Sequence, residues 1–171
     1  MSDITKVLRD DHARLRRLFL RASQAPESLD IAWDLCDELT IHSTIEQEIV
    51  YPALAKLDAG LAQRSEEEHE EAAEIAAEIE DLDPFDTAVF PLLVQLKKAV
   101  IRHIESEEKS VFPILEKAYP DQLLEMGSQA FALRQELMGA RPTRRTQNRS
   151  ATANWGWGNR RKESATTNMG F

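Results

Sequence analysis

All four histidines of this 171-residue chain follow one repeated pattern, in which a lone histidine precedes a histidine with a glutamate four positions later. The residues are His12, the pair His42/Glu46, His69 and the pair His103/Glu107. Positions i and i+4 of an α-helix lie ~40° apart around the axis and ~6 Å apart along it, so each pair shares a face. Imidazole nitrogens and carboxylate oxygens together suit transition metals. The pattern therefore predicts a site for a pair of transition-metal ions.

The types of ligand favour iron. If Glu46 and Glu107 bridge the two metals, each metal receives two imidazoles and two carboxylate oxygens and keeps open positions. We therefore predict two iron ions as the cofactor, with manganese or zinc less favoured, because structural zinc sites are closed and tend to use cysteine. Cys36 is the single cysteine of the chain.

A ferritin-like carboxylate site is the alternative, but it needs two Glu-x-x-His elements. Only Glu66 and His69 have that spacing, so the pattern does not fit that class.

Helices must bring these residues together. The gaps of 30, 27 and 34 residues between successive histidines each fit one helix and a short connection. Apolar periodicity predicts bundle helices over residues 2–24, 29–51, 61–82 and 86–111. A fifth helix over 121–138 has no histidine and should pack outside the metal centre. The predicted fold class is all-α, an antiparallel up-down four-helix bundle with an extra C-terminal helix.

Three prolines affect these helix boundaries. Pro52 should bend or end the second helix, and Pro113 should end the fourth, because proline lacks the amide donor and clashes with the preceding turn. Pro91 lies either in the first turn of a shorter helix or at a kink of a longer one.

An internal repeat supports the bundle. HSTIEQEIVYPALAK (42–56) aligns without gaps with HIESEEKSVFPILEK (103–117), and Tyr51 matches Phe112. The chain thus contains two copies of a helical hairpin, each with one lone histidine and one His/Glu pair. Two hairpins facing each other predict a pseudo-twofold axis through the ligands.

Composition divides the chain into a bundle domain, residues 1–140, and a basic tail, residues 141–171, which is predicted to be disordered. Trp155 and Trp157 stand between arginines of the tail and could stack on single-stranded nucleic acid, although a silent tail is the favoured interpretation. The net charge of −9 is the sum of +6 in the tail and −15 in the body, and the acidic body disfavours binding of nucleic acid or an anionic membrane. No apolar run could span a membrane and no secretory signal is present, so we expect a cytoplasmic protein.

The succession His, His-x-x-x-Glu, His, His-x-x-x-Glu, with Tyr51-Pro52 and Phe112-Pro113 after the paired elements, resembles the hemerythrin-like (HHE cation-binding) family over about residues 3–118. The resemblance implies a non-haem di-iron centre with the four histidines as terminal ligands and the two glutamates as bridges. Members of that family carry oxygen, sense oxygen or iron, respond to nitric oxide or break down peroxide. Oxygen carriers of the family have another histidine one turn beyond the third-helix ligand. Here that position is Ala73, and Glu66 is the nearest carboxylate that could replace it.

The missing imidazole disfavours reversible oxygen carriage. We therefore expect a protein that binds dioxygen, peroxide or nitric oxide, with peroxide decomposition as the favoured activity and a catalase-like di-iron oxidoreductase as the enzyme class if there is turnover. The alternative is a module that senses or stores oxygen, nitric oxide or iron without turnover. Asp11 and Glu68 flank the lone histidines and could orient them, but surface charges are the favoured interpretation.

Overall fold

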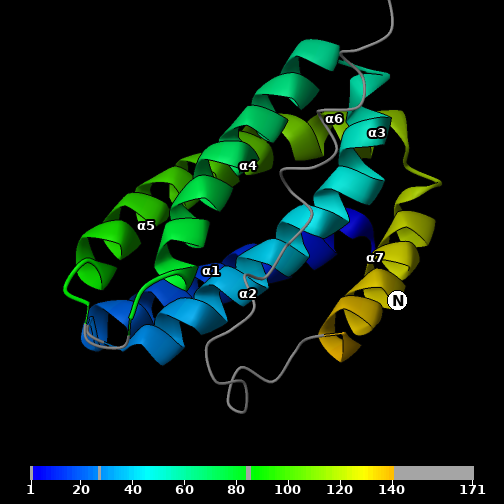
Figure 1. Ribbon diagram of the computed structural model, residues 1–171. Helices are drawn as coiled ribbons and strands as arrows, with labels where there is room; N and C mark the ends of the chain where they lie inside the picture. Colours follow the sequence, from blue (N-terminus) through cyan, green and yellow to red (C-terminus); the bar gives the residue numbers. More distant parts are fainter. Residues whose placement is uncertain (1, 27, 84–85, 141–171) are drawn as a thin grey trace, which may run out of the picture. The chain divides into compact units, whose positions relative to one another are not determined.

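The computed structural model describes residues 2–26, 28–83 and 86–140, whose regular structure is entirely helical. The predicted tail, residues 141–171, lies outside the described residues. Four long helices form the bundle: α1 (Ile4–Gln24), α2 (Leu29–Ile45), α4 (Ala59–Glu80) and α5 (Val89–Ser106). α1 packs against α2, α2 against α4, α4 against α5 and α5 against α1, which closes the ring (Figure 1). The predicted four-helix bundle is confirmed.

No described helix is both long enough and apolar enough to cross a membrane.

Two aspartates start bundle helices. The side chain of Asp3 accepts a hydrogen bond from the Lys6 amide (2.9 Å), and that of Asp58 accepts one from the Leu61 amide (2.8 Å). Each satisfies an amide that has no partner within its helix. α5 begins at Val89, so Pro91 lies in the first turn, where a missing amide proton breaks no helical hydrogen bond. The shorter helix is thus the correct alternative.

Pro52 and Pro113 do not end the helices that contain them, which corrects the prediction for Pro113. α2 continues into a π-helical turn, η1 (Glu46–Val50), and then into α3 (Tyr51–Ala55); α5 continues into η2 (Glu107–Val111) and α6 (Phe112–Ala118). The amide of Tyr51 donates to the carbonyl of Glu46, five residues back, and Phe112 does the same to Glu107. The wider π turn accommodates the proline, which would disrupt a regular α turn.

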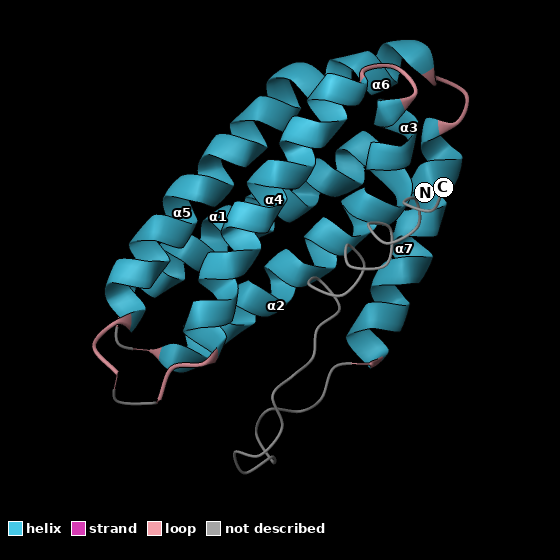
Figure 2. Cartoon of the chain, turned by 45° about the horizontal axis from the view of Figure 1, so that its top comes forward, coloured by secondary structure: helices cyan, strands magenta, loops and turns pink. Residues whose placement is uncertain are grey.

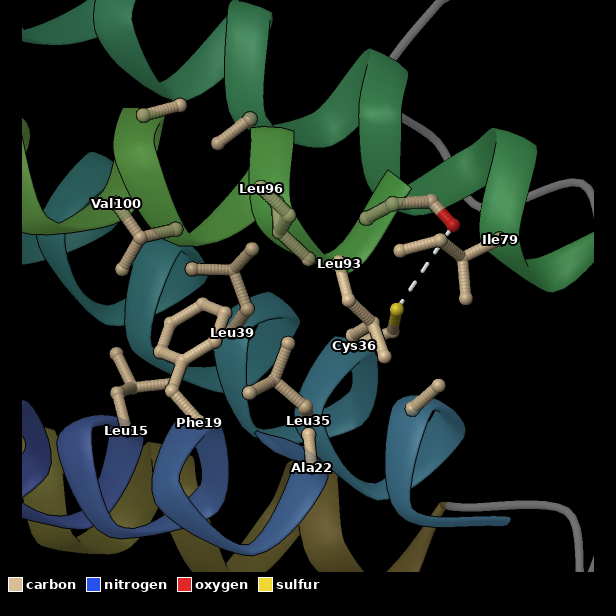
Figure 3. Close-up of a cluster of buried hydrophobic side chains, with 14 of the residues drawn as sticks. Leu15, Phe19, Ala22, Leu35, Cys36, Leu39, Ile79, Leu93, Leu96 and Val100 are labelled. Atoms are coloured by element: carbon tan, nitrogen blue, oxygen red, sulfur yellow. Dashed lines mark hydrogen bonds between the residues drawn. The ribbon is translucent and has the colours of Figure 1, made fainter. Parts of the chain in front are cut away.

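The apolar core consists of two clusters. One includes Leu15, Phe19, Leu35, Leu39 and Leu96 (Figure 3). The other includes Ile4, Leu8, Ile45, Tyr51 and Phe112. Along α1 the first cluster begins at Leu15 and the second ends at Leu8, so His12 lies between them. The same holds on α4, where His69 lies between Ala62 and Ala72. Two apolar layers therefore enclose the level of the histidines.

The fifth predicted helix, α7 (Leu123–Gly139), packs on α1 and α2 outside the ring (Figure 2). Gly127 permits this approach, because a Cβ atom at that position would lie 2.9 Å from the carbonyl carbon of Asp3 and still closer to the carbonyl oxygen of Ser2. The beginning of α1 and the middle of α7 are thus in backbone contact.

We predict that Gly127→Ala destabilises the protein by about 1–3 kcal/mol, because the methyl group meets rigid backbone and must push α7 away. Chemical unfolding measures the change. Gly139→Ala is the matched control, since a Cβ there meets no atom within 4 Å, and it should leave stability unchanged or slightly raised. Equal stability of the two variants would contradict the close contact between α7 and the N-terminus.

Candidate metal centre

The structure brings all six predicted ligands together. Each bundle helix supplies one histidine, and each π turn begins with a glutamate: His12 from α1, His42 from α2, His69 from α4, His103 from α5, Glu46 from η1 and Glu107 from η2. All six side chains are buried, with no more than 2% of any residue exposed. The shared face of each His/Glu pair, expected from the helical repeat, is the face turned to the bundle axis.

Each carboxylate faces one histidine from its own hairpin and one from the other. Oε2 of Glu46 lies 3.2 Å from Nε2 of His42 and 2.9 Å from Nε2 of His69. Oε2 of Glu107 lies 3.3 Å from Nε2 of His103 and 3.4 Å from Nε2 of His12. Oε2 of Glu46 also lies 3.7 Å from Nε2 of His103, so the two halves match in these pairs without being identical.

Two overlapping groups of side chains could each hold a cation. One consists of His42, Glu46, His69 and His103, and the other of His12, His42, Glu46 and Glu107; within each group the ligand atoms lie within 4.8 Å of one another. Among the described residues, several of these buried atoms lack a hydrogen-bond partner: Nε2 of His12, Nε2 of His42, Oε1 of Glu46 and Oε2 of Glu107. Buried polar atoms rarely remain unsatisfied. The residues present therefore fit a metal site.

The charges of the metal-free cluster are strongly coupled. Burial raises the pKa of Glu107, but the charge and hydrogen bond of His103 outweigh burial and hold that pKa well below its usual value. Burial and the neighbouring charge of Glu107 raise the pKa of Glu46. Burial lowers the pKa of His103, yet Glu107 and the other carboxylates raise it well above 6.5. For His69, burial and the charge of His103 lower the pKa well below 6.5.

Carboxylates outside the cluster face the Nδ1 atoms of three histidines. Glu108 lies 2.9 Å from Nδ1 of His12, and Glu68 lies 3.0 Å from Nδ1 of His103. Asp11 lies 3.9 Å from Nδ1 of His42. Such partners fix the orientation of an imidazole whose other nitrogen binds metal.

The interpretation of Asp11 and Glu68 as surface charges is therefore wrong. Asp11 is buried, and Glu68 is hydrogen-bonded to an imidazole. Each faces a histidine of the adjacent bundle helix rather than its sequence neighbour, because helix packing and not chain order decides which ring lies in front of it. Glu108, which sequence reasoning passed over, follows Glu107 directly and turns to α1 for the same reason.

Tyr51 is a further residue of the centre that the sequence analysis did not select. Its hydroxyl lies 3.0 Å from Nε2 of His69, 3.2 Å from Oε1 of Glu107 and 3.5 Å from Oε2 of Glu46. Burial and the charges of Glu107 and Glu46 raise its pKa well above 10, so the phenol keeps its proton. The sequence repeat could have indicated this residue, because it aligns Tyr51 with Phe112 directly after the two His/Glu pairs.

The aligned Phe112 has a different environment. Its ring stacks on that of His12 at 5.6 Å between centroids, and the guanidinium of Arg9 lies 5.0 Å above the phenyl ring. The two copies of the repeat thus place a phenol on one side of the centre and a phenyl ring on the other.

Glu66 does not replace the histidine missing at Ala73. It is exposed and belongs to neither group of candidate ligands. Ala73 itself is only half-buried. Glu66 is therefore not the substitute that the sequence predicted. The groups that contact Nε2 of His69 are Glu46 (2.9 Å), His103 (2.9 Å) and the hydroxyl of Tyr51 (3.0 Å).

Comparison with protein families matches residues 3–115 with the hemerythrin HHE cation binding domain. The match spans more than half of the chain and includes all six converging residues. Comparisons with curated proteins and with solved structures give no match. Together with the helical bundle and its buried His/Glu groups, the match identifies the chain as a member of the hemerythrin HHE cation-binding domain family.

Proposed function

We propose that the protein holds two iron ions in the buried cluster and acts on dioxygen, peroxide or nitric oxide, with peroxide decomposition as the favoured activity. The observation that carries this proposal is the pair of overlapping ligand groups, which share His42 and Glu46. One cation would leave part of the cluster unsatisfied, whereas two cations would neutralise both buried carboxylates. His12, His42, His69 and His103 are the proposed terminal ligands, and Glu46 and Glu107 the bridges.

Iron fits the donor set best. Two imidazoles and two carboxylate oxygens for each ion are a mixed set that suits iron, and the buried Cys36 is remote from the cluster, against the carbonyl of Ala76 (3.8 Å). Bound iron would supply exchange of electrons with a small oxygen species. Two molecules of hydrogen peroxide would give one of dioxygen and two of water, so no external reductant is needed.

The protein's own groups would manage protons and exclude water. Tyr51 has the only phenol at the centre among the described residues, and its proton lies within hydrogen-bond distance of Glu107. Its hydroxyl would hold a proton toward a small oxygen species beside His69 and Glu46, and Glu107 would accept that hydrogen bond when no such species is present. The apolar clusters on both sides keep bulk water out, which strengthens each of these electrostatic interactions.

The alternative function is sensing or storage of oxygen, nitric oxide or iron without turnover. Its support is the deep burial of all six ligands, which restricts access to diatomic or similarly small molecules and slows exchange. The two functions differ in one measurable property, which is whether peroxide is consumed repeatedly.

We predict that His42→Ala and Glu107→Ala each lower the iron content of the purified protein by at least half, because each removes a ligand from the cluster. Both should also lower the melting temperature, since the remaining buried groups lose their partners. Elemental analysis measures the iron. Glu66→Ala is the matched control, because this glutamate is exposed and outside both groups. Wild-type iron content in His42→Ala and Glu107→Ala would refute the proposed ligand set.

We predict that iron-loaded protein evolves dioxygen from hydrogen peroxide over many turnovers, and that Tyr51→Phe lowers the rate by about 10²-fold, a typical loss for a positioned proton donor. Iron content should stay at the wild-type level. Tyr119→Phe serves as the control, because that hydroxyl bonds to the carbonyl of Ala53 and not to the centre. A stable, reversible ligand spectrum without gas evolution in wild-type protein would support the alternative function instead.

We predict that iron affinity rises with pH. Because the pKa of His103 lies well above 6.5 without metal, its ring is protonated at neutral pH, and iron must displace the proton from Nε2. Affinity should therefore fall about tenfold for each proton displaced and each unit by which the pH decreases. Competition with a chelator at several pH values measures the slope, and proton release on iron addition in weak buffer checks it. A slope of zero would contradict the charge state assigned to His103.

A further inference from the structure

Arg134 is a buried arginine on α7, the helix that lies outside the ring. It is the one basic side chain, other than the histidines, among the buried residues of the described chain, with 8% of its surface exposed. Arginine is almost never fully buried unless it is paired. Its partners therefore indicate what it does.

The guanidinium joins carboxylates of α1 and α2. Nη2 of Arg134 donates to Oδ2 of Asp11, and Nη1 donates to Oε1 of Glu38 at 2.7 Å. Arg14 also donates to Oε1 of Glu38, at 2.9 Å. Two arginines thus balance two buried carboxylates, and α7 contributes one of the four groups.

The same oxygen of Asp11 that accepts from Arg134 also faces a proposed metal ligand. Oδ2 of Asp11 lies 3.9 Å from Nδ1 of His42, within ion-pair range and slightly beyond a hydrogen bond. The opposite nitrogen of that ring, Nε2, lies 3.2 Å from Glu46. Among the described residues no side chain is hydrogen-bonded to Nδ1 of His42, and Asp11 is the carboxylate within ion-pair distance of it. The orientation of this imidazole therefore depends on where Asp11 is held.

The other two orienting carboxylates are held differently. Glu108, which faces His12, pairs with Arg16 at 3.1 Å, and both side chains are partly exposed. Glu68, which faces His103, lies 4.0 Å from the partly exposed Arg102. Both of these ion pairs form between segments of the four-helix ring, and their side chains are partly exposed to solvent. The link to His42 alone among the three is buried and passes through α7.

We propose that Arg134 is a positioning residue for the metal centre, which fixes the His42 imidazole through Asp11 and so couples the docking of α7 to metal binding. The inference rests on the proposed role of His42 as a metal ligand. Without Arg134, Asp11 would keep a buried charge with fewer partners and would shift toward Arg14 or the imidazole. His42 belongs to both candidate ligand groups, so a shift of this one ring disturbs either group.

The test measures the affinity of the full-length protein for iron(II), without oxygen, by competition with a chelator. Arg134→Met keeps most of the side-chain volume and removes the fork of donors. We expect affinity to fall by about 10–100-fold, the usual effect of losing a partner that orients a ligand. Asp11→Asn should cause a similar fall, and the double variant no more than the larger single effect, because the two residues act through one another.

Met126→Ala is the matched control. Met126 is a buried apolar residue of α7, so its truncation loosens the same helix without touching the charged link. It should lower the melting temperature and leave iron affinity unchanged. The second readout is the ¹⁵N NMR signal of the His42 ring in metal-free protein, which should shift in Arg134→Met and Asp11→Asn and stay in place in Met126→Ala.

Each outcome decides the inference. Unchanged iron affinity and an unchanged His42 signal in Arg134→Met would overturn it, as would an equal loss of affinity in Met126→Ala. If Arg134→Met does not fold, Asp11→Asn gives the same decision, because that substitution changes charge and not size. His42→Ala, measured in parallel, separates the two proposals: wild-type affinity there overturns both, whereas loss there with full affinity in Arg134→Met and Asp11→Asn overturns only the role of Arg134.

Discussion

Two carboxylates, Glu46 and Glu107, lie between apolar layers with none of their surface exposed, and the structure depends on how their charges are balanced. An ionised group taken out of water costs several kcal/mol unless opposite charge or hydrogen bonds compensate. In the metal-free cluster the compensation comes mainly from the proton that His103 retains. Cations would replace that proton and also satisfy the unbonded atoms. Folding of the bundle and binding of cations are therefore linked, because both balance the same charges.

The local backbone supports this arrangement in both copies of the repeat. Each glutamate is the first residue of a π turn, and a proline follows six residues later. In a π turn the backbone hydrogen bond spans five residues instead of four, which changes the direction of the side chains that follow. Tyr51 and Phe112 are thereby placed against the ligand cluster rather than along the helix that an unbroken α geometry would give. Each proline thus lies just after a π turn, at the beginning of the next α-helix, and does not end the helical segment.

The ligand set could be predicted from sequence because it depends on short-range geometry. A spacing of four residues fixes the shared face of His42 and Glu46 on any helix, and the repeat brings the second pair to the matching level. The charged groups around the cluster depend on long-range packing. Asp11 and Glu68 face rings on neighbouring helices, and Arg134 pairs with Asp11 from a helix without histidines. Such contacts depend on the angle at which two helices cross and on how deeply each side chain is buried. A single sequence specifies neither quantity.

The two halves of the site are not equivalent, although the repeat makes their ligands alike. The hydroxyl of a buried phenol, Tyr51, lies at hydrogen-bond distance from His69 and from both carboxylates. On the side of His12 the aligned Phe112 offers only an apolar face, with Arg9 beyond it. Under the proposed function, a small molecule that gains negative charge on reduction would be stabilised beside Tyr51 and not beside Phe112. Such an asymmetric site would orient its ligand. It supports the proposed peroxide chemistry, which needs a proton at one oxygen, over the storage of an uncharged gas.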